Sequence, residues 1–200
     1  MSDTPLRERW DDHLPLGRWL EAVASPLPLP AGGRVASIAG AFAAALVEKI
    51  GRIVLRSAKR AALHPVAGDV AAGAAALRPL MLAVGEADDR AYGAVMAAKR
   101  ATAGAAASAP LQDAQLAAAR LQLTLLEHCV KVVELAGCLE ADVGPALGAD
   151  LATARRLAWA AAAAAMGNIE ADLQDLPSAP AAAAIRAEAD AAMKRVTPRE

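Results

Sequence analysis

The order of apolar and polar positions indicates helix along nearly the whole chain. No segment alternates between the two with a period of two residues, so the pattern predicts no strand. Helices are expected over residues 5–24 with a break at Pro15, 34–62, from after Gly68 to about Val84, 88–100, 111–141, 150–176 and 181–195. The sequence therefore predicts an all-α protein, a bundle of about six to seven helices in orthogonal or antiparallel packing.

Capping residues and helix breakers mark several of the expected boundaries. Asp88 or Asp89 is expected to cap a short helix, and Asp150 is expected to cap the last long one. A short side chain at such a position can accept a hydrogen bond from the free N–H groups of the first turn. Pro79 predicts a kink. Residues 101–110 are typical of a loop, and 176–180 are the only plausible linker.

The composition favours one domain with a thin core. Two hundred residues suit a single domain, taken as residues 1–200. Alanine dominates the apolar residues, and it forms helices well but fills little space. Such helices must approach one another closely, and each buries little apolar area per residue. Association with a second copy would add buried area, so a homodimer is expected.

Charge and aromatic content argue against nucleic acid and membrane as partners. The 21 basic and 22 acidic residues leave no field of a single sign, and the five aromatic residues (three Trp, one Tyr and one Phe) are too few for a base-stacking surface. The longest uncharged apolar run, residues 35–47, is shorter than the roughly 20 residues that span a bilayer. The first residues do not resemble a signal peptide, so a cytoplasmic location is expected.

The cysteines and histidines show no reactive or metal-binding pattern. Cys129 and Cys138 fall on opposite faces of one predicted helix and are interpreted as buried free thiols. His13, His64 and His128 have no ligand spacing with one another or with either cysteine, so no metal is expected. No Ser-His-Asp or Cys-His arrangement and no phosphate loop of the Walker type can be argued.

A proline-bounded turn leads into the most distinctive predicted helix. Residues 28–33 read Pro-Leu-Pro-Ala-Gly-Gly, and the prolines hold the chain extended while Gly32 and Gly33 let backbone N–H groups face outward. The helix N-terminus that follows is a place where anionic ligand groups bind. An ordinary turn entering a helix has the same pattern.

Three further segments carry information together with this turn. They are Asp-Asp-Arg-Ala-Tyr at residues 88–92 before Val-Met-Ala-Ala, Asp-Leu-Ala-Thr-Ala at 150–154, and Asn-Ile-x-x-Asp-Leu at 168–173. In order and spacing, over about residues 18–176, the four segments resemble the formiminotetrahydrofolate cyclodeaminase and methenyltetrahydrofolate cyclohydrolase family. The family has Pro-Thr-Pro-Gly-Gly-Gly-Ser at the turn, Asp-x-x-Ala-Tyr/Phe, Ser-Asp-Leu-Gly-Val-Ala, and Asn-Val-x-x-Asn-Leu. The helix at 181–195 lies beyond the resemblance.

Several positions depart from the family's pattern. Ala31 replaces a glycine and narrows the backbone angles that the turn can adopt. Arg34 replaces a small serine, adding bulk and permanent charge where a ligand would approach. At the other positions a hydroxyl is lost (Ala149), a carboxylate replaces an amide (Asp172), a valine replaces a threonine (Val54) and a glutamine replaces a proline (Gln122).

The resemblance implies a reaction of one-carbon metabolism with a tetrahydrofolate derivative as substrate. Hydrolysis of 5,10-methenyltetrahydrofolate to 10-formyltetrahydrofolate is preferred, because 200 residues leave no room for a formiminotransferase domain. The alternative is the cyclodeaminase reaction, which closes a formimino group onto the neighbouring nitrogen and releases ammonia. A non-catalytic, folate-binding or scaffolding homologue is a third hypothesis, and the departures favour it.

The resemblance also implies roles for individual residues. Asp88 is expected as the general base or cation stabiliser. The substrate-binding positions are Gly32, Gly33, Arg34, Lys59, Asp150 and Asn168. Asp88 and Asp150 have helix capping as their structural alternative, Asn168 has a hydrogen bond to a neighbouring helix, and Lys59 has a solvated basic helix face.

Two of these residues raise questions that sequence leaves open. Arg34 is expected to pair with a folate carboxylate in an active site, or to fill the pocket or pair with Asp88 or Asp150 in a vestigial one. Asp150 and Asn168 are 18 residues apart on one predicted helix, which separates them by about 27 Å. If both serve one site, it must draw on two subunits or hold a long ligand such as folate.

Overall fold

The computed structural model describes residues 15–101, 108–176 and 179–197, and this part of the chain is helical apart from short connections. The prediction of an all-α fold is confirmed. The helices are α1 (Leu16–Val23), α2 (Gly32–Leu55), α3 (His64–Ala101), α4 (Ala109–Glu140), α5 (Pro145–Leu173) and α6 (Pro180–Val196), with a short 3₁₀ helix, η2 (Ala58–Leu63), before α3.

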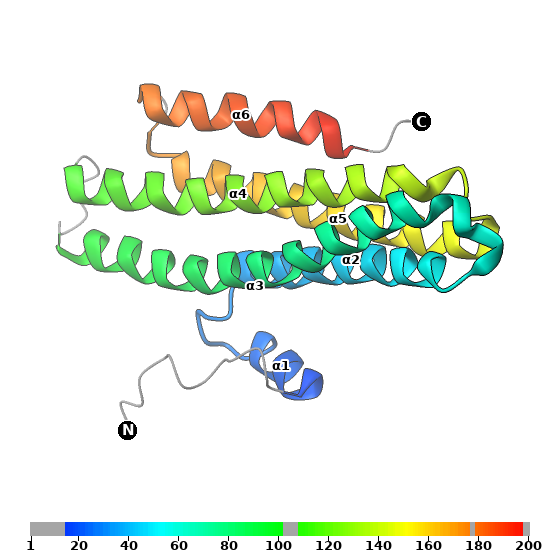
Figure 1. Ribbon diagram of the computed structural model, residues 1–200. Helices are drawn as coiled ribbons and strands as arrows, with labels where there is room; N and C mark the ends of the chain where they lie inside the picture. The colour runs from blue at the N-terminus through cyan, green and yellow to red at the C-terminus, as the bar shows by residue number, and fades with distance from the viewer. Residues whose placement is uncertain (1–14, 102–107, 177–178, 198–200) are drawn as a thin grey trace.

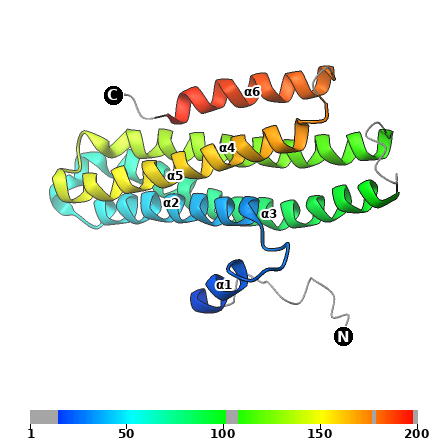
Figure 2. The ribbon, with the colours of Figure 1, turned by 180° about the vertical axis from the view of Figure 1, so that it is seen from behind.

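Four long helices, α2 to α5, run side by side and alternate in direction (Figure 1). Each packs against the next one in the chain, and α5 closes the bundle by packing against α2. α6 covers α4 and α5 on one side (Figure 2). α1 stands away from the other side, with its Cα atoms more than 8 Å from those of every other described helix. The core therefore lies along the axis of the four-helix bundle.

Small residues allow these helices to approach closely, as the composition predicted. Gly51 on α2 is an example, because a Cβ there would lie 2.9 Å from the Ala67 carbonyl oxygen and 3.0 Å from the Ala71 Cβ on α3. On α5 the buried face is almost entirely alanine, with Leu151 and Ile169 near its ends. Dispersion contacts between backbones replace the contacts that larger side chains would make.

The helix boundaries around two predicted caps are different from expectation. α3 continues from His64 to Ala101, so Asp88 lies in a helix interior and is not an N-cap. The residues that precede it, Gly-Glu-Ala, do not break a helix that is packed along its whole length. α5 begins at Pro145 after Gly144, whose φ of +79° ends the previous connection, and Asp150 therefore lies past the first turn.

Other helix boundaries also differ from the predicted ones. The helix predicted over 34–62 ends at Leu55 and is followed by η2. Pro65 falls in the first turn of α3, where a missing N–H is tolerated, and Pro79 lies inside the helix. The segment 5–14, most of the predicted loop 101–110 and part of the predicted linker at 177–178 lie outside the described residues.

The two cysteines have different environments. Cys129 is buried in the core, and burial raises the pKa of its thiol to about 12. Cys138 is exposed, so the prediction that both are buried is wrong for this one. It lies on the outer face of α4, where its Sγ is within 3.4 Å of the Glu134 carbonyl oxygen. Both thiols are free, as predicted.

One helical stretch, Ala58–Ala101, is long and apolar enough by length and composition to cross a membrane. Most of it is α3, which packs between α2 and α4 in the bundle. A single core helix of this kind is weak evidence for a membrane span.

Candidate functional site

The N-terminal end of α2 meets the middle of α3 and α4 in a tightly packed polar layer. A Cβ on Gly33 would lie 2.5 Å from the Gln122 Nε2 atom and 2.8 Å from the Asp88 Cγ atom. Only glycine leaves room for both side chains at this point. On Gly32, by contrast, a Cβ would meet nothing within 4 Å, and this residue is exposed.

Asp88 is held on two sides in this layer. The Gln122 Nε2 atom donates a hydrogen bond of 2.6 Å to its Oδ1 atom, and the Gly33 backbone lies against the same carboxyl group. Burial raises the pKa of Asp88, and the hydrogen bond from Gln122 acts in the opposite direction. The result is a rigidly placed carboxyl group that binds a proton more readily than an exposed aspartate does.

A second carboxyl group reaches this layer from α5. Burial and the charge of Asp88 raise the pKa of Asp172 to about 6, while Lys99 on α3 acts to lower it. Asn168 lies one helical turn before Asp172 on α5 and is half-buried. The charge of Asp88 on α3 thus acts on the protonation of Asp172 on α5.

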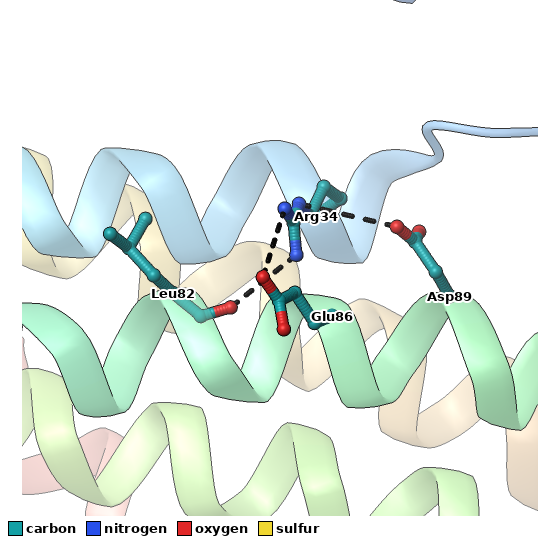
Figure 3. Close-up of polar contacts among 4 residues, drawn as sticks. All are labelled: Arg34, Leu82, Glu86 and Asp89. Atoms are coloured by element: carbon teal, nitrogen blue, oxygen red, sulfur yellow. Dashed lines mark hydrogen bonds and ion pairs between the residues drawn. The ribbon is translucent and has the colours of Figure 1, made fainter. Parts of the chain in front are cut away.

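Arg34 lies beside the layer and faces α3 (Figure 3). Its side chain is only 1% exposed. The guanidinium donates to the Leu82 carbonyl oxygen at 3.4 Å and lies 3.9 Å from Glu86 and 4.0 Å from Asp89. Among the described residues its acidic partners are thus Glu86 and Asp89 of α3, rather than the Asp88 or Asp150 that the sequence suggested.

The environment of Arg34 affects two further groups. Burial raises the pKa of Asp89 to about 6, and the arginine acts to lower it. The guanidinium also lies 5.9 Å from the ring centre of Trp19 on α1, a cation–π distance. Arg34 thus connects α1 to the bundle, a role that sequence reasoning did not foresee.

The structure brings together Gly32, Gly33, Arg34 and Asp88, with Asn168 one turn from the layer. It places Asp150 and Lys59 elsewhere. Asp150 binds Lys49 at 2.8 Å, and Lys49 lies about 24 Å along α2 from Gly33. Lys59 is an exposed residue of η2, beyond the C-terminal end of α2. Within one chain, neither reaches the layer around Asp88.

Sequence reasoning did not assign Gln122, Asp89, Lys99 or Asp172 to the site. Asp172 and Gln122 were noted only as departures from the family's pattern. A signal for Gln122 was present, because an amide among leucines on a helix must find a partner when it is buried. Which partner it finds depends on the packing of α4 against α3, and that is not encoded in the local pattern.

The layer can accept and donate protons through the carboxyl groups of Asp88 and Asp172, while the Gln122 amide donates a hydrogen bond and Lys99 adds a positive charge nearby. Among the residues that the structure describes, no group of three or more His, Cys, Asp and Glu side chains has the geometry of a metal site. The carboxyl groups of the layer support acid–base and electrostatic chemistry.

Comparisons with known proteins identify the family and the fold. The chain is similar to formiminotetrahydrofolate cyclodeaminase from Thermotoga maritima, with a TM-score of 0.77 and 20% identity over 92% of this chain and 94% of that one. No curated protein matches the sequence. A family model described as formiminotransferase-cyclodeaminase matches residues 15–191, nearly the whole chain. The protein therefore belongs to the formiminotransferase-cyclodeaminase family.

Proposed function

We propose that this protein is a folate-dependent enzyme of one-carbon metabolism that hydrolyses 5,10-methenyltetrahydrofolate to 10-formyltetrahydrofolate. Membership of the family supports a tetrahydrofolate derivative as substrate, and the similar structure is named for a reaction on formiminotetrahydrofolate. The observation that carries the proposal is Asp88, a carboxyl group fixed between the Gly33 backbone and the Gln122 amide. The expected location is the cytoplasm.

In this reaction Asp88 is the general base. The methenyl carbon shares a positive charge with two nitrogens, and a carboxylate beside it stabilises that charge. Water adds to the carbon and gives a proton to Asp88. The bond from that carbon to N5 then breaks, N5 takes one proton, the second proton is released, and the formyl group stays on N10. The raised pKa of Asp88 makes it a stronger base for the first step.

The remaining site residues take binding roles in this proposal. Gly32 and Gly33 form a backbone wall, and the half-buried Asn168 amide binds a pterin edge. Asp150 and Lys59 contribute only through a second copy of the chain or at the far end of the long ligand. Arg34 holds Asp89 beside the site and would have to leave α3 to reach a folate carboxylate.

The cyclodeaminase reaction is the second candidate, and Asp172 favours it. Release of ammonia requires a proton donor at the leaving nitrogen. Asp172 has a pKa of about 6 and lies in the same layer as Asp88, so near neutral pH a fraction of its carboxyl groups carries that proton. Formation of ammonia from formiminotetrahydrofolate separates this reaction from the hydrolysis.

A non-catalytic folate-binding homologue is the third candidate, and Arg34 favours it. The family's small serine is replaced by a buried guanidinium that fills space between α2 and α3. Binding of a reduced folate without turnover would support this candidate over both reactions.

The protein is also proposed to form a homodimer. α1 and the outer face of α2 line an apolar groove of about 670 Å³, and several of its side chains are exposed. Phe42 on α2 is 52% exposed and Leu20 on α1 is 61% exposed. An alanine-rich bundle gains apolar burial when a second copy covers such a face.

The decisive experiment follows the absorbance of 5,10-methenyltetrahydrofolate with the purified chain, corrected for uncatalysed hydrolysis. We expect Asp88→Asn to lower the rate by a factor of about 100 or more, because general base catalysis is lost. The stability change should stay within about 1 kcal/mol, because the new amide oxygen keeps the Gln122 hydrogen bond.

The matched control is Asp69→Asn, an exposed aspartate on the same helix. It should leave both rate and melting temperature close to those of the parent. Equal rates for the parent and Asp88→Asn would overturn the role of Asp88. A parent that neither binds nor turns over any reduced folate would overturn the proposed function as a whole.

A further inference from the structure

All four helices of the bundle contribute one residue to the layer around Asp88. Gly33 comes from α2, Gln122 from α4 and Asp172 from α5, and Asp88 itself lies on α3. Gln122 touches the Asp88 carboxyl group directly and carries no charge. It is therefore the side chain best placed to control Asp88 without taking part in proton transfer.

The buried Gln122 amide makes a hydrogen bond through its donor and none through its acceptor within the described part of the chain. The side chain is 1% exposed, and its Nε2 atom donates to Asp88 at 2.6 Å. Its Oε1 atom is buried and has no hydrogen-bond partner in the described part of the chain. An unpartnered buried acceptor lowers stability, and a leucine of similar size would avoid this loss. What distinguishes Gln122 from other buried amides is its partner, because its donor contacts Asp88 beside the Gly33 backbone.

We propose that Gln122 is a positioning residue, whose amide donor fixes the Asp88 carboxylate against the Gly33 backbone in the orientation that the reaction uses. The inference rests on the proposed function for the reaction that Asp88 performs. It concerns a position where the resemblance places proline, so it describes a feature of this chain.

The amide also acts on the charge of Asp88. A hydrogen bond donated to a carboxylate favours its ionised form, so Gln122 opposes the effect of burial on the pKa. The other charged groups near this carboxyl group are Asp172 from α5 and Asp89 from α3, and Lys99 and Arg34 act on these two aspartates. Loss of the amide donor therefore raises the pKa of Asp88 further.

The test compares Gln122→Leu with Gln115→Leu. Gln115 is a close match, because it lies two turns earlier on α4, is also 1% exposed, donates to an aspartate (Asp175, at 3.3 Å) and has an unpartnered Oε1 atom. For Gln122→Leu we expect kcat to fall about tenfold or more, as for loss of a hydrogen bond to a charged group, and the acidic limb of the pH–rate profile to move to higher pH. For Gln115→Leu we expect neither change.

A double-variant cycle shows whether Gln122 acts through Asp88. In the Asp88→Asn background, Gln122→Leu should cause little further loss of kcat, because the group that it positions is already inactive. Independent, multiplying losses would overturn the inference. An unchanged pH–rate profile in Gln122→Leu, with the loss confined to KM or to stability, would overturn it as well.

A measurement without substrate keeps this inference separate from the proposed function. The Asp88 carboxyl carbon can be titrated by NMR in the free protein, in the parent and in Gln122→Leu. An upward shift of the pKa in the variant is expected even if no folate is turned over. An unchanged titration would remove the basis for the positioning role, whatever the activity of the parent proves to be.

Discussion

At the scale of single residues, polar side chains on small-residue helices determine the chemistry of this protein. A carboxyl group among alanines and leucines has few partners, so burial dominates its protonation. Asp172 and Asp89 both have a pKa of about 6 for this reason, although their nearest cations, Lys99 and Arg34, act in the opposite direction. Stability is therefore expected to depend on pH near neutrality.

Asp172→Asn should stabilise the protein at neutral pH and leave it nearly unchanged at pH 4. The folded-state pKa is about 6 and the ordinary value is 3.8, so the folded state binds more protons between these values. Stability from this group is present below pH 4 and is lost as the pH rises through 6. We expect a gain of about 1 kcal/mol at pH 7, less than the full shift implies because the side chain is partly exposed.

Urea denaturation at pH 4, 5.5 and 7.5 measures this change. Asp113→Asn, an exposed aspartate on α4, is the control and should show no such trend. A stability difference for Asp172→Asn that is the same at all three pH values would contradict the explanation by burial.

At the scale of elements, close backbone approach holds α2 against α3. The seam includes Gly51, where the neighbours of a Cβ would be backbone atoms of α3 and the Ala71 Cβ atom, none of which can rotate away. The contrast with α1 is large, because that helix is tied to the bundle by side chains such as Trp19 against Arg34. The same small residues that weaken a side-chain core therefore give the long helices a tight interface.

Gly51→Ala should destabilise the protein by about 1–3 kcal/mol, because α2 must move away from α3 to accommodate the methyl group. Gly68→Ala is the matched control on α3, since a Cβ there meets nothing within 4 Å. It should stabilise by up to about 1 kcal/mol through helix propensity. Thermal unfolding monitored by circular dichroism measures both, and a stabilised Gly51→Ala would show that the seam is not tight.

At the scale of the whole molecule, the apolar groove between α1 and α2 leaves large side chains exposed. If a second copy covers this face, Phe42→Glu should convert a dimer into a monomer at micromolar concentration, because a charge replaces buried apolar area. Light scattering after gel filtration measures the mass. Trp159→Glu, an exposed aromatic residue on α5, should remain dimeric. A parent that is monomeric, or a dimer disrupted only by Trp159→Glu, would contradict this surface.

Local patterns in the sequence predicted the fold class, most of the helices and the family of this protein. Helical periodicity, capping signals and breakers act within a few residues, and they were sufficient for the all-α fold and for most helices. The order of short motifs indicated the family and linked Gly33 with Asp88, which the structure places in contact. The same local signals misplaced Asp88 as a cap, because packing along α3 overrides a weak start signal.

Only the tertiary structure decided which side chains meet. Gln122 and Asp88 are 34 residues apart, and their contact depends on the register between α3 and α4. Arg34 turned toward α3, and Asp150 paired with Lys49 at the other end of the bundle, for the same kind of reason. Sequence determines the face of a helix on which a residue lies. The partner across that face depends on how far neighbouring helices slide and rotate against one another, and packing of the whole core determines this.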